Sequence, residues 1–305
     1  MNYELSIITV NYNGLEDTCS LIDSIPFDAL PLEVIVVDNA SKQDEASIIA
    51  ERNPQVKVIR SNKNLGFAGG NNLGIQAAQG KYLFFINNDT ELRGSDFERK
   101  HTLTTLIKRL ESDPQISMVC PKLRFTWTGN PIQFTGYTPL SRLTVRNHAI
   151  GFGESDNGQY DTAHPTPYGH GAAMMVKREV IDKVGMMPEC YFLYYEEIDW
   201  SMIFTRAGYT IWYEPLSTVY HKESQTTGQN SPLRTYYISR NRLLLVKRNW
   251  NGFTKYAAYA YLILLVGLRD IIKYSFKNQP KLRQAVFRGL NDFLHHRLGP
   301  QQITN

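Results

Sequence analysis

The chain has 305 residues, of which 42% are apolar and 20% charged, and it carries a formal net charge of +4. This length and composition are typical of an ordinary globular protein with one large domain, or with a domain and an appendage. Three isolated cysteines, Cys19, Cys120 and Cys190, argue against a disulfide framework and a zinc site, so we expect a reducing compartment.

The charge is divided unevenly along the chain. Residues 226–305 contain 13 Lys and Arg against two acids, a net charge of +11, whereas residues 1–225 contain 20 against 27, a net charge of −7. This division predicts a first domain of residues 1–225 and a basic tail of residues 226–305. The N-terminal residues have a short apolar run without a basic lead, so we expect a first strand and no secretory signal there.

Short apolar runs alternate with helical patterns over the first 120 residues. The runs are rich in β-branched residues and nearly continuous, as is typical of strands covered on both faces. We therefore predict an α/β domain with a mostly parallel sheet, whose ligands bind beyond the carboxyl ends of its strands. The predicted strands are residues 5–10, 32–37, 56–60, 82–86 and 116–120.

Residues 125–167 lack this pattern and are rich in Gly, Pro, Thr and aromatic residues. We interpret them as an irregular insertion that shapes a binding cleft. A strand is predicted at residues 171–177. Two further short strands are predicted later in the domain, and His221 ends the second of them.

A helix is predicted before these two strands, and it ends at Gly208, a residue type that suits the end of a helix. Glu196 and Glu197 therefore stand at its N-terminus. Asp199 lies in the first turn, where a favourable interaction with the helix dipole explains an acid. The buried stripe of this helix is expected to contain Trp200, Ile203, Phe204 and Ala207.

The tail beyond Ser231 has a helical and basic pattern. Lys255 and Arg269 enclose 13 uncharged residues, fewer than the roughly 20 that cross a bilayer. We predict a helix that lies on an anionic membrane surface, and the alternative is a helix packed on the first domain with a solvated basic face. No nucleic-acid partner is predicted, because no recognised motif accompanies the charge.

Polar residues follow the predicted strands, where a parallel sheet binds its ligands. Asp38 comes directly after the second strand, where it could bond a nucleobase or ribose, or cap a helix that begins near Ser41. The glycine-rich residues 62–74 do not fit the G-x-G-x-x-G fingerprint and lack a Walker lysine. We interpret these glycines as places where the backbone approaches a bulky ligand, with Asn71 and Asn72 as amide donors.

The segment KYLFFINNDTELR, residues 81–93, ends a buried strand with Asn87, Asn88 and Asp89. One interpretation is a turn, which Asn and Asp favour. The other is a cation site, because Mg²⁺ or Mn²⁺ is commonly held by one or two carboxylates together with substrate phosphates. We predict Asp89 as a metal ligand and His221 as a nitrogen ligand, with an ordinary core or surface position as the alternative for His221.

The ordered set of motifs resembles glycosyltransferase family 2, most closely its rhamnosyltransferase branch of bacterial surface-polysaccharide assembly. The resemblance covers roughly residues 4–250. It implies the type A fold of nucleotide-diphospho-sugar transferases, followed here by a C-terminal helical extension, with an inverting mechanism and Mg²⁺ or Mn²⁺. The motifs are SIITVNYNG, VIVVDNAS, NLGFAGGNNLGI, YLFFINNDTEL, GHGAAMMVKREVIDKVG, YFLYYEEIDW, STVYHKES and YYISRNRLLLVKRNW.

Matching the family motifs residue by residue implies a site for the donor nucleotide. Asn71 stands where many relatives have an Arg, and Asn87 replaces the first acid of the Asp-x-Asp metal motif. Asp89, His221 and the donor diphosphate are therefore expected to hold the metal. The residues expected at the nucleotide are Thr9, Asn11, Asp38, Gly69, Asn71, Asn72 and Asn88.

The family's Glu-Asp pair matches Glu196 and Glu197, with Glu in place of the second acid. The resemblance implies that Glu197 is the general base for the attacking sugar hydroxyl, with Glu196 near the acceptor. Arg240 of the motif SRN is expected at a diphosphate of the donor or of a lipid-linked acceptor, with a solvated surface as the alternative. His170 is expected on the acceptor side, with a core or cleft-wall position as the alternative.

These expectations combine into a metal-dependent inverting glycosyltransferase. It would move a sugar, with rhamnose as one candidate, from a dTDP- or UDP-linked donor to a glycan or polyprenyl-linked acceptor. Its expected place is the cytoplasmic face of the cell membrane, bound peripherally. The alternatives are a sugar nucleotidyltransferase, which would need a Lys-containing phosphate loop where this chain has NYNG, and an inactive sugar-nucleotide-binding protein, of which Asn87 would be the first sign.

Overall fold

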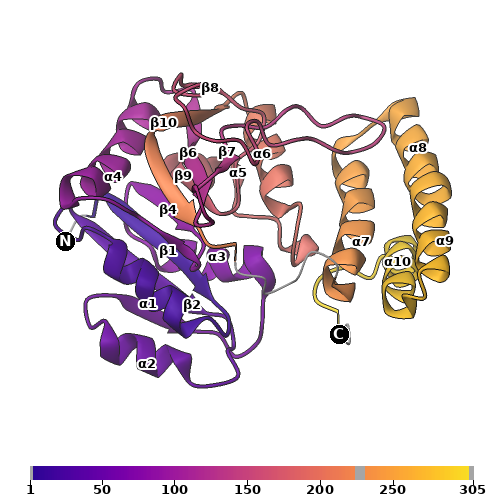
Figure 1. The fold of residues 1–305 in the computed structure, drawn as a ribbon, viewed down its shortest axis with the longest axis horizontal. Helices are drawn as coiled ribbons and strands as arrows, with labels where there is room; N and C mark the ends of the chain where they lie inside the picture. Colours follow the sequence, from indigo (N-terminus) through magenta and orange to yellow (C-terminus); the bar gives the residue numbers. More distant parts are fainter. Residues whose placement is uncertain (1–2, 224–230, 302–305) are drawn as a thin grey trace.

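The computed structural model describes residues 3–223 and 231–301, and a ten-stranded mixed sheet forms one end of the molecule (Figure 1). The strand order is β3-β2-β1-β4-β9-β6-β10-β5, with β7 beside β6 and β8 beside β10. The strands are β1 (Leu5–Asn11), β2 (Leu32–Asp38), β3 (Lys57–Arg60), β4 (Tyr82–Ile86), β5 (Thr90–Glu91), β6 (Ile116–Phe125), β7 (Ile132–Phe134), β8 (His164–Pro165), β9 (Ala173–Lys177) and β10 (Thr210–His221).

The long strands of the sheet mostly point the same way. β3, β2, β1 and β4 pair in parallel, and β6 pairs in parallel with β10. β9 lies between β4 and β6 and is antiparallel to both, so the two parallel groups share one direction. Every residue of β4 and β9 is buried, which explains why their sequences are continuous apolar runs. The predicted strands and the mostly parallel sheet are thus confirmed.

The end of the domain differs from the prediction. The two short strands expected before His221 form a single strand, β10. Its register against β6 shifts between Glu214 and Thr218, around Pro215, which cannot donate to a ladder. The sequence break at Pro215 therefore marks a bulge within one strand and not a turn between two.

Helices pack around the sheet and form the other end of the molecule (Figure 1). In α6, Trp200 and Phe204 are buried as predicted, but Ala207 is exposed and follows the last helical residue. Gly208 has φ +88° and ends the helix as expected. The helices are α1 (Leu15–Ser24), α2 (Glu45–Arg52), α3 (Gly66–Ala77), α4 (Asp96–Glu111), α5 (Arg178–Val184), η1 (Glu189–Tyr191), α6 (Glu196–Arg206), α7 (Pro232–Asn249), α8 (Gly252–Ala260), the π-helix η2 (Tyr261–Gly267), α9 (Leu268–Phe276) and α10 (Pro280–Leu294).

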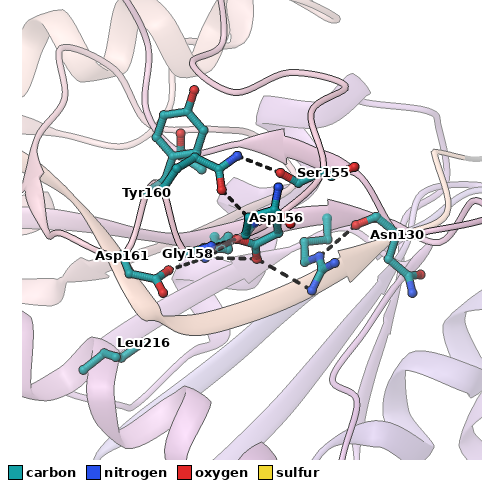
Figure 2. Close-up of polar contacts among 12 residues, drawn as sticks. Asn130, Ser155, Asp156, Gly158, Tyr160, Asp161 and Leu216 are labelled. Atoms are coloured by element: carbon teal, nitrogen blue, oxygen red, sulfur yellow. Dashed lines mark hydrogen bonds and ion pairs between the residues drawn. The ribbon is translucent and has the colours of Figure 1, made fainter.

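The insertion of residues 125–167 is fixed to the sheet by a network of ion pairs. Lys122 of β6 is buried, and its Nζ lies 3.0 Å from Asp156 and 2.6 Å from Asp161. Arg124 lies 3.6 Å from Asp156 and donates from Nε to the carbonyl of Asn130. Figure 2 shows Asp156 and Asp161 side by side above the strand. An irregular segment is thereby held in place, so it can shape a cleft.

The tail is attached to the first domain by buried contacts of α7. Asp199 of α6 is fully buried and accepts hydrogen bonds from Arg248 Nε at 2.5 Å and from Asn249 Nδ2 at 2.7 Å. The helix dipole is therefore not the main reason for an acid at position 199. α10 packs on α7, and Tyr236 OH donates to Asp292 at 2.8 Å. None of the helices within residues 3–223 and 231–301 is long and apolar enough to span a membrane.

Candidate active site

Asp89 and His221 are 132 positions apart in the chain and in direct contact in the fold. Asp89 follows β4, and the next two residues form β5, which pairs with the end of β10 so that Thr90 faces His221. His221 Nε2 consequently lies 3.1 Å from Asp89 Oδ1. Both residues are more than nine-tenths buried. The fold thus brings together the two residues that the sequence suggested as metal ligands.

Gln133 of β7 orients the ring of His221. Its Oε1 lies 2.9 Å from His221 Nδ1 and accepts the N–H there. Nε2 then presents its lone pair to the carboxylate of Asp89. Because Nε2 and Oδ1 of Asp89 are both acceptors and lie 3.1 Å apart, a proton or a cation must lie between them. A second-nitrogen bond of this kind is usual for a metal-ligating His. Gln133 was not predicted, because its one signal is a polar residue between two apolar ones.

The pair fits one part of a divalent cation's coordination shell. Within the described part of the chain, no group of three or more His, Cys, Asp or Glu side chains could hold a metal ion. A cation at this place could therefore take Asp89 and His221 as ligands, and no third side chain of these types among the described residues. The remaining positions would fall to the donor phosphates and to water, as is common for Mg²⁺ and Mn²⁺.

A strained turn places Glu196 and Glu197 at the start of α6. Tyr194 and Tyr195 precede them with φ values of +68° and +79°. Such values are unfavourable for residues with side chains and persist only where the surroundings impose them. Asn241 of α7 supplies that restraint, because its Nδ2 donates to the carbonyls of Tyr194 at 3.1 Å and of Leu193 at 2.6 Å.

The two glutamates differ in their protonation. Burial, followed by the charge of Glu197, raises the pKa of Glu196 well above its usual range. Oε2 of Glu196 is buried and has no hydrogen-bond partner among the described residues. Burial also raises the pKa of Glu197, but only to about 6. Burial thus opposes ionisation of Glu196 strongly, and Glu197 is the carboxylate that can accept a proton at neutral pH.

Aromatic residues connect Glu197 with the Asp89–His221 pair. Tyr137 is half-buried, and burial and the charge of Glu197 both raise the pKa of its hydroxyl. Its ring stacks on His170 with 5.8 Å between centroids, and His170 is close enough to His221 for that residue to lower its pKa. A wall formed by Tyr137 and His170 thus runs from the Asp89–His221 pair to Glu197.

His170 is part of this wall and stays neutral. Burial, and to a lesser extent the nearby His221, lowers the pKa of His170 to about 3. Its Nδ1 accepts the backbone N–H of Ala172 at 3.1 Å. A Cβ on Gly171 would lie 3.9 Å from Cγ of Glu197, so this glycine segment borders the carboxylate directly. The cleft-wall alternative for His170 fits this geometry.

The polar residues after β1 and β2 form one buried network. Asn11 Nδ2 donates to Asp38 Oδ1 at 2.9 Å and to Glu45 at 2.8 Å, and Ser41 donates from its hydroxyl to Asp38. The helix-cap alternative for Asp38 is wrong, because α2 begins later and Asp44 caps it. The buried hydroxyl of Thr9 has no hydrogen-bond partner among the described residues. Asn88 Nδ2 donates to Thr18 at 3.1 Å.

Comparison with known proteins places this arrangement in a family. Residues 6–185, more than half of the chain, match the family described as Glycosyl transferase family 2. The chain belongs to glycosyl transferase family 2. The expected enzyme class, a glycosyltransferase, is thereby confirmed, whereas the rhamnosyltransferase branch stays a prediction.

A family-2 relative matches nearly the whole chain. The low-salt glycan biosynthesis hexosyltransferase Agl10 of Haloferax volcanii is 24% identical over 306 residues, which cover 98% of this chain and 94% of that protein. The succinoglycan biosynthesis protein ExoO of Rhizobium meliloti is 26% identical over 98 residues, or 32% of this chain and 28% of that one.

Solved structures share the fold at low sequence identity. The mannosyltransferase PcManGT of Pyrobaculum calidifontis, in complex with GDP-Man and Mn²⁺, has a TM-score of 0.58 and 14% identity over 97% of this chain and 88% of its own. GalNAc-T7 with UDP, GalNAc and Mn²⁺ has a TM-score of 0.59 and 15% identity over 96% of this chain, which spans 56% of that longer chain. The predicted type A glycosyltransferase fold is confirmed.

The glycine-rich α3 of this family-2 chain has a packing role that the sequence reading missed. A Cβ on Gly74 would lie 2.3 Å from Ile8 Cγ2, and one on Gly70 would lie 2.8 Å from Val10 Cγ1. These glycines therefore let α3 approach β1, and the interpretation that they admit a ligand is wrong for them. A Cβ on Gly69 would similarly meet Leu65 at 2.6 Å.

The two expected amide donors of α3, Asn71 and Asn72, donate hydrogen bonds within the protein. Asn72 Nδ2 donates to the carbonyl of Met187 at 3.0 Å and to Glu189 at 2.7 Å, so both of its N–H groups are taken. The expected nucleotide contact of Asn72 is therefore wrong. Asn71 donates one N–H to the carbonyl of Phe67 at 3.0 Å.

Arg240 is neither on a solvated surface nor at a diphosphate. It is fully buried, and its terminal nitrogens donate to the carbonyls of Tyr191 at 2.7 Å and of Gly299 at 2.8 Å. Its Nε donates to Asn241 at 2.9 Å. Both earlier interpretations of Arg240 are wrong, because its donors face backbone carbonyls. Together with Asn241, it ties α7 to the segment that leads to Glu196.

Proposed function

We propose that this chain is a metal-dependent, inverting glycosyltransferase that moves a hexose from a nucleotide-diphosphate donor to a sugar hydroxyl. The observation that carries the proposal is the wall from the Asp89–His221 pair through His170 and Tyr137 to Glu197. The Haloferax volcanii relative is a hexosyltransferase, which supports a hexose as the transferred group. Two structural neighbours, GalNAc-T7 with UDP and Mn²⁺ and PcManGT with GDP-Man and Mn²⁺, support the donor and the metal.

The proposed reaction assigns a separate task to each end of the wall. A divalent cation, when bound, would supply positive charge to the departing diphosphate. Asp89 and His221 would hold it, with Gln133 keeping the His221 lone pair toward the site. Glu197 would accept the proton of the acceptor hydroxyl while that oxygen bonds to the anomeric carbon and the bond to the diphosphate breaks. Attack opposite the leaving group inverts the anomeric centre.

A donor panel tests this function. Purified protein with Mn²⁺ and a simple sugar acceptor should release nucleoside diphosphate from at least one of the UDP-, dTDP- and GDP-linked hexoses, dTDP-rhamnose included. Release should stop when EDTA removes the metal, because the departing diphosphate then loses the cation that would stabilise its charge. A donor that raises the melting temperature without any release would favour the inactive binding protein instead.

The proposed acceptor is a glycan, free or linked to a polyprenyl phosphate, met by the protein at the cytoplasmic face of the cell membrane. α8, η2 and α9 lie at the edge of the molecule away from the sheet (Figure 1). Leu268, Ile272 and Phe276 of α9 follow at intervals of four residues and are 51%, 53% and 89% exposed. The exposed Arg269, Lys273 and Lys277 flank this stripe. An apolar stripe edged by cations suits an anionic lipid surface.

Membrane binding can be tested without disturbing the fold, because the stripe is exposed. Ile272→Ser combined with Phe276→Ser is expected to weaken binding to vesicles of anionic lipid by about tenfold or more, since each apolar side chain contributes roughly 1.5–3 kcal/mol when buried. Sedimentation with vesicles measures this. Phe97→Ser, a change at a 76% exposed Phe of α4, serves as the control. Equal sedimentation of all three proteins would refute the membrane surface.

A further inference from the structure

A groove lies between the helical end of the molecule and the insertion. Its volume is about 410 Å³, within the range of ordinary ligand sites. Figure 1 shows a loop of the insertion reaching across to α7 and α8, where Trp250 Nε1 donates to the carbonyl of Arg142. The groove is lined by residues 145–147 of this loop, by Tyr195, and by side chains of α7, η2, α9 and α10.

One side of the groove is basic. Arg146, Arg234 and Arg242 all line it. Arg242 donates from Nε to Tyr195 OH at 3.0 Å, and its two terminal nitrogens bond to no described residue. Arg146 is exposed, and its side chain has no hydrogen bond or ion pair within the described chain. These donors can bind an anion with several oxygens.

Little negative charge opposes these arginines. Asp270 is the one acid among the described lining residues, and Arg269 neutralises it at 2.7 Å. Asn147 adds a further donor, because its Nδ2 is buried and has no hydrogen-bond partner among the described residues. A phosphate or diphosphate group therefore fits this side of the groove better than a neutral ligand does.

Another part of the groove lining is apolar. It is formed by Leu262 and Val266 of η2 and by Val286 and Leu290 of α10. Residues 261–267 are π-helical, a rare conformation that frequently marks a functional site. On the outer surface of the same segment, Leu264 and Leu265 are 58% and 62% exposed. One short segment thus borders both the groove and the proposed membrane surface.

The groove also adjoins the candidate active site. Tyr195, which lines the groove, directly precedes Glu196 in the chain. The insertion loop connects the two places as well, because Tyr137 near Glu197 pairs with Ala149, and residues 145–147 of the same loop line the groove. A molecule held in the groove would therefore extend toward the carboxylate that accepts the proton.

We propose that this groove binds the anchor of the acceptor: a phosphate or diphosphate on the arginines, with the attached hydrocarbon chain along η2 and α10. The inference rests on the proposed function, since it names the acceptor class of that site. A free sugar phosphate would use the arginines alone, whereas a lipid phosphate would use both sides. The apolar side and the exposed stripe beyond it favour the lipid phosphate.

Farnesyl diphosphate is a suitable probe, and isothermal titration calorimetry measures its binding. The experiment is done without divalent metal and with the Asp89→Asn variant, which lacks the proposed donor metal site. We expect binding in this background. Inorganic diphosphate and farnesol should each bind at least about tenfold more weakly, because each uses one side of the groove. Arg146→Glu should weaken the binding of farnesyl diphosphate by about tenfold, and Arg242→Ala should weaken it by a similar factor.

The control is Arg283→Glu, the same charge change at an exposed arginine of α10 outside the groove, which should leave the affinity within about twofold. Equal binding of inorganic and farnesyl diphosphate, or an equal loss in Arg283→Glu and Arg146→Glu, would overturn the proposal. Arg146 is exposed, so its variant stays informative if Arg242→Ala does not fold. Failure of the donor panel would leave this binding result unchanged, which separates the two proposals.

Discussion

Glu197→Gln is expected to lower kcat by about a thousandfold, while the affinity for the nucleotide-sugar donor stays within about twofold. The amide keeps the shape of the side chain but cannot accept the proton of the acceptor hydroxyl. Donor affinity should persist because Asp89 and His221 at the other end of the wall are unchanged. Steady-state release of nucleoside diphosphate and calorimetry with the donor measure the two quantities.

The pH profile of the same variant adds a second signature. Burial raises the pKa of Glu197 to about 6, so the carboxylate of the wild type is lost as the pH falls through about 6. Wild-type kcat/KM should therefore decline below that pH, and the residual activity of Glu197→Gln should lack this decline. Tyr137 and His170 do not produce it, because burial raises the pKa of Tyr137 and lowers that of His170 to about 3, whereas the pKa of Glu196 is raised well above its usual range.

Glu196→Gln is the matched control for this prediction. Glu196 is buried, burial raises its pKa well above the usual range, and Gln reproduces the uncharged form that burial favours. Its variant should keep kcat within about tenfold of the wild type, because no proton needs to leave or join this side chain. Full activity of Glu197→Gln, or a loss in Glu196→Gln as deep as in Glu197→Gln, would remove Glu197 as the base.

Asp89→Asn is expected to abolish metal-dependent turnover, with a loss of roughly a hundredfold or more. Asp89 is the one carboxylate beside His221 Nε2, and Asn87 stands where the family motif has a second acid. Without the charge of Asp89, His221 alone would have to compete with the water molecules that coordinate the cation. Turnover measured over a range of Mn²⁺ concentrations should show no recovery at concentrations that saturate the wild type.

Gln133→Met provides a graded comparison. It keeps both ligands and removes only the acceptor that fixes the His221 ring, 2.9 Å from Nδ1. The Mn²⁺ concentration for half-maximal turnover should rise by about tenfold, the usual effect of losing such a partner, and excess metal should restore kcat. A Gln133→Met enzyme as inactive as Asp89→Asn would point to a role for β7 other than orienting His221.

Much of the fold and the outline of the site could be predicted from the sequence, for a physical reason. The β-branched runs give the strands, and the carboxyl ends of parallel strands meet at one edge of a sheet. The proximity of Asp89 and His221 is in line with this rule, because Asp89 follows β4 and His221 ends β10. Gln133 could not be predicted in the same way, since β7 pairs antiparallel within an insertion that has no periodicity.

The errors have equally definite causes. Gly70 and Gly74 are four residues apart on a helix, so they share the face that packs on β1, but a ligand loop also favours glycine. Arg240 looks like a surface cation in sequence, and its role depends on the carbonyls of Tyr191 and Gly299, which only the tertiary structure brings to it. Two strands were predicted where β10 is one strand, because the bulge around Pro215 interrupts its sequence pattern.

Binding of Mn²⁺ in the presence of a nucleoside diphosphate tests the central claim most directly. Electron paramagnetic resonance counts the free ion, so bound Mn²⁺ follows by difference in the wild type, Asp89→Asn and Glu197→Gln. We expect one Mn²⁺ per chain in the wild type and in Glu197→Gln, and about a hundredfold weaker binding in Asp89→Asn. Unchanged Mn²⁺ binding in Asp89→Asn would contradict the assignment of the Asp89–His221 pair as the metal site.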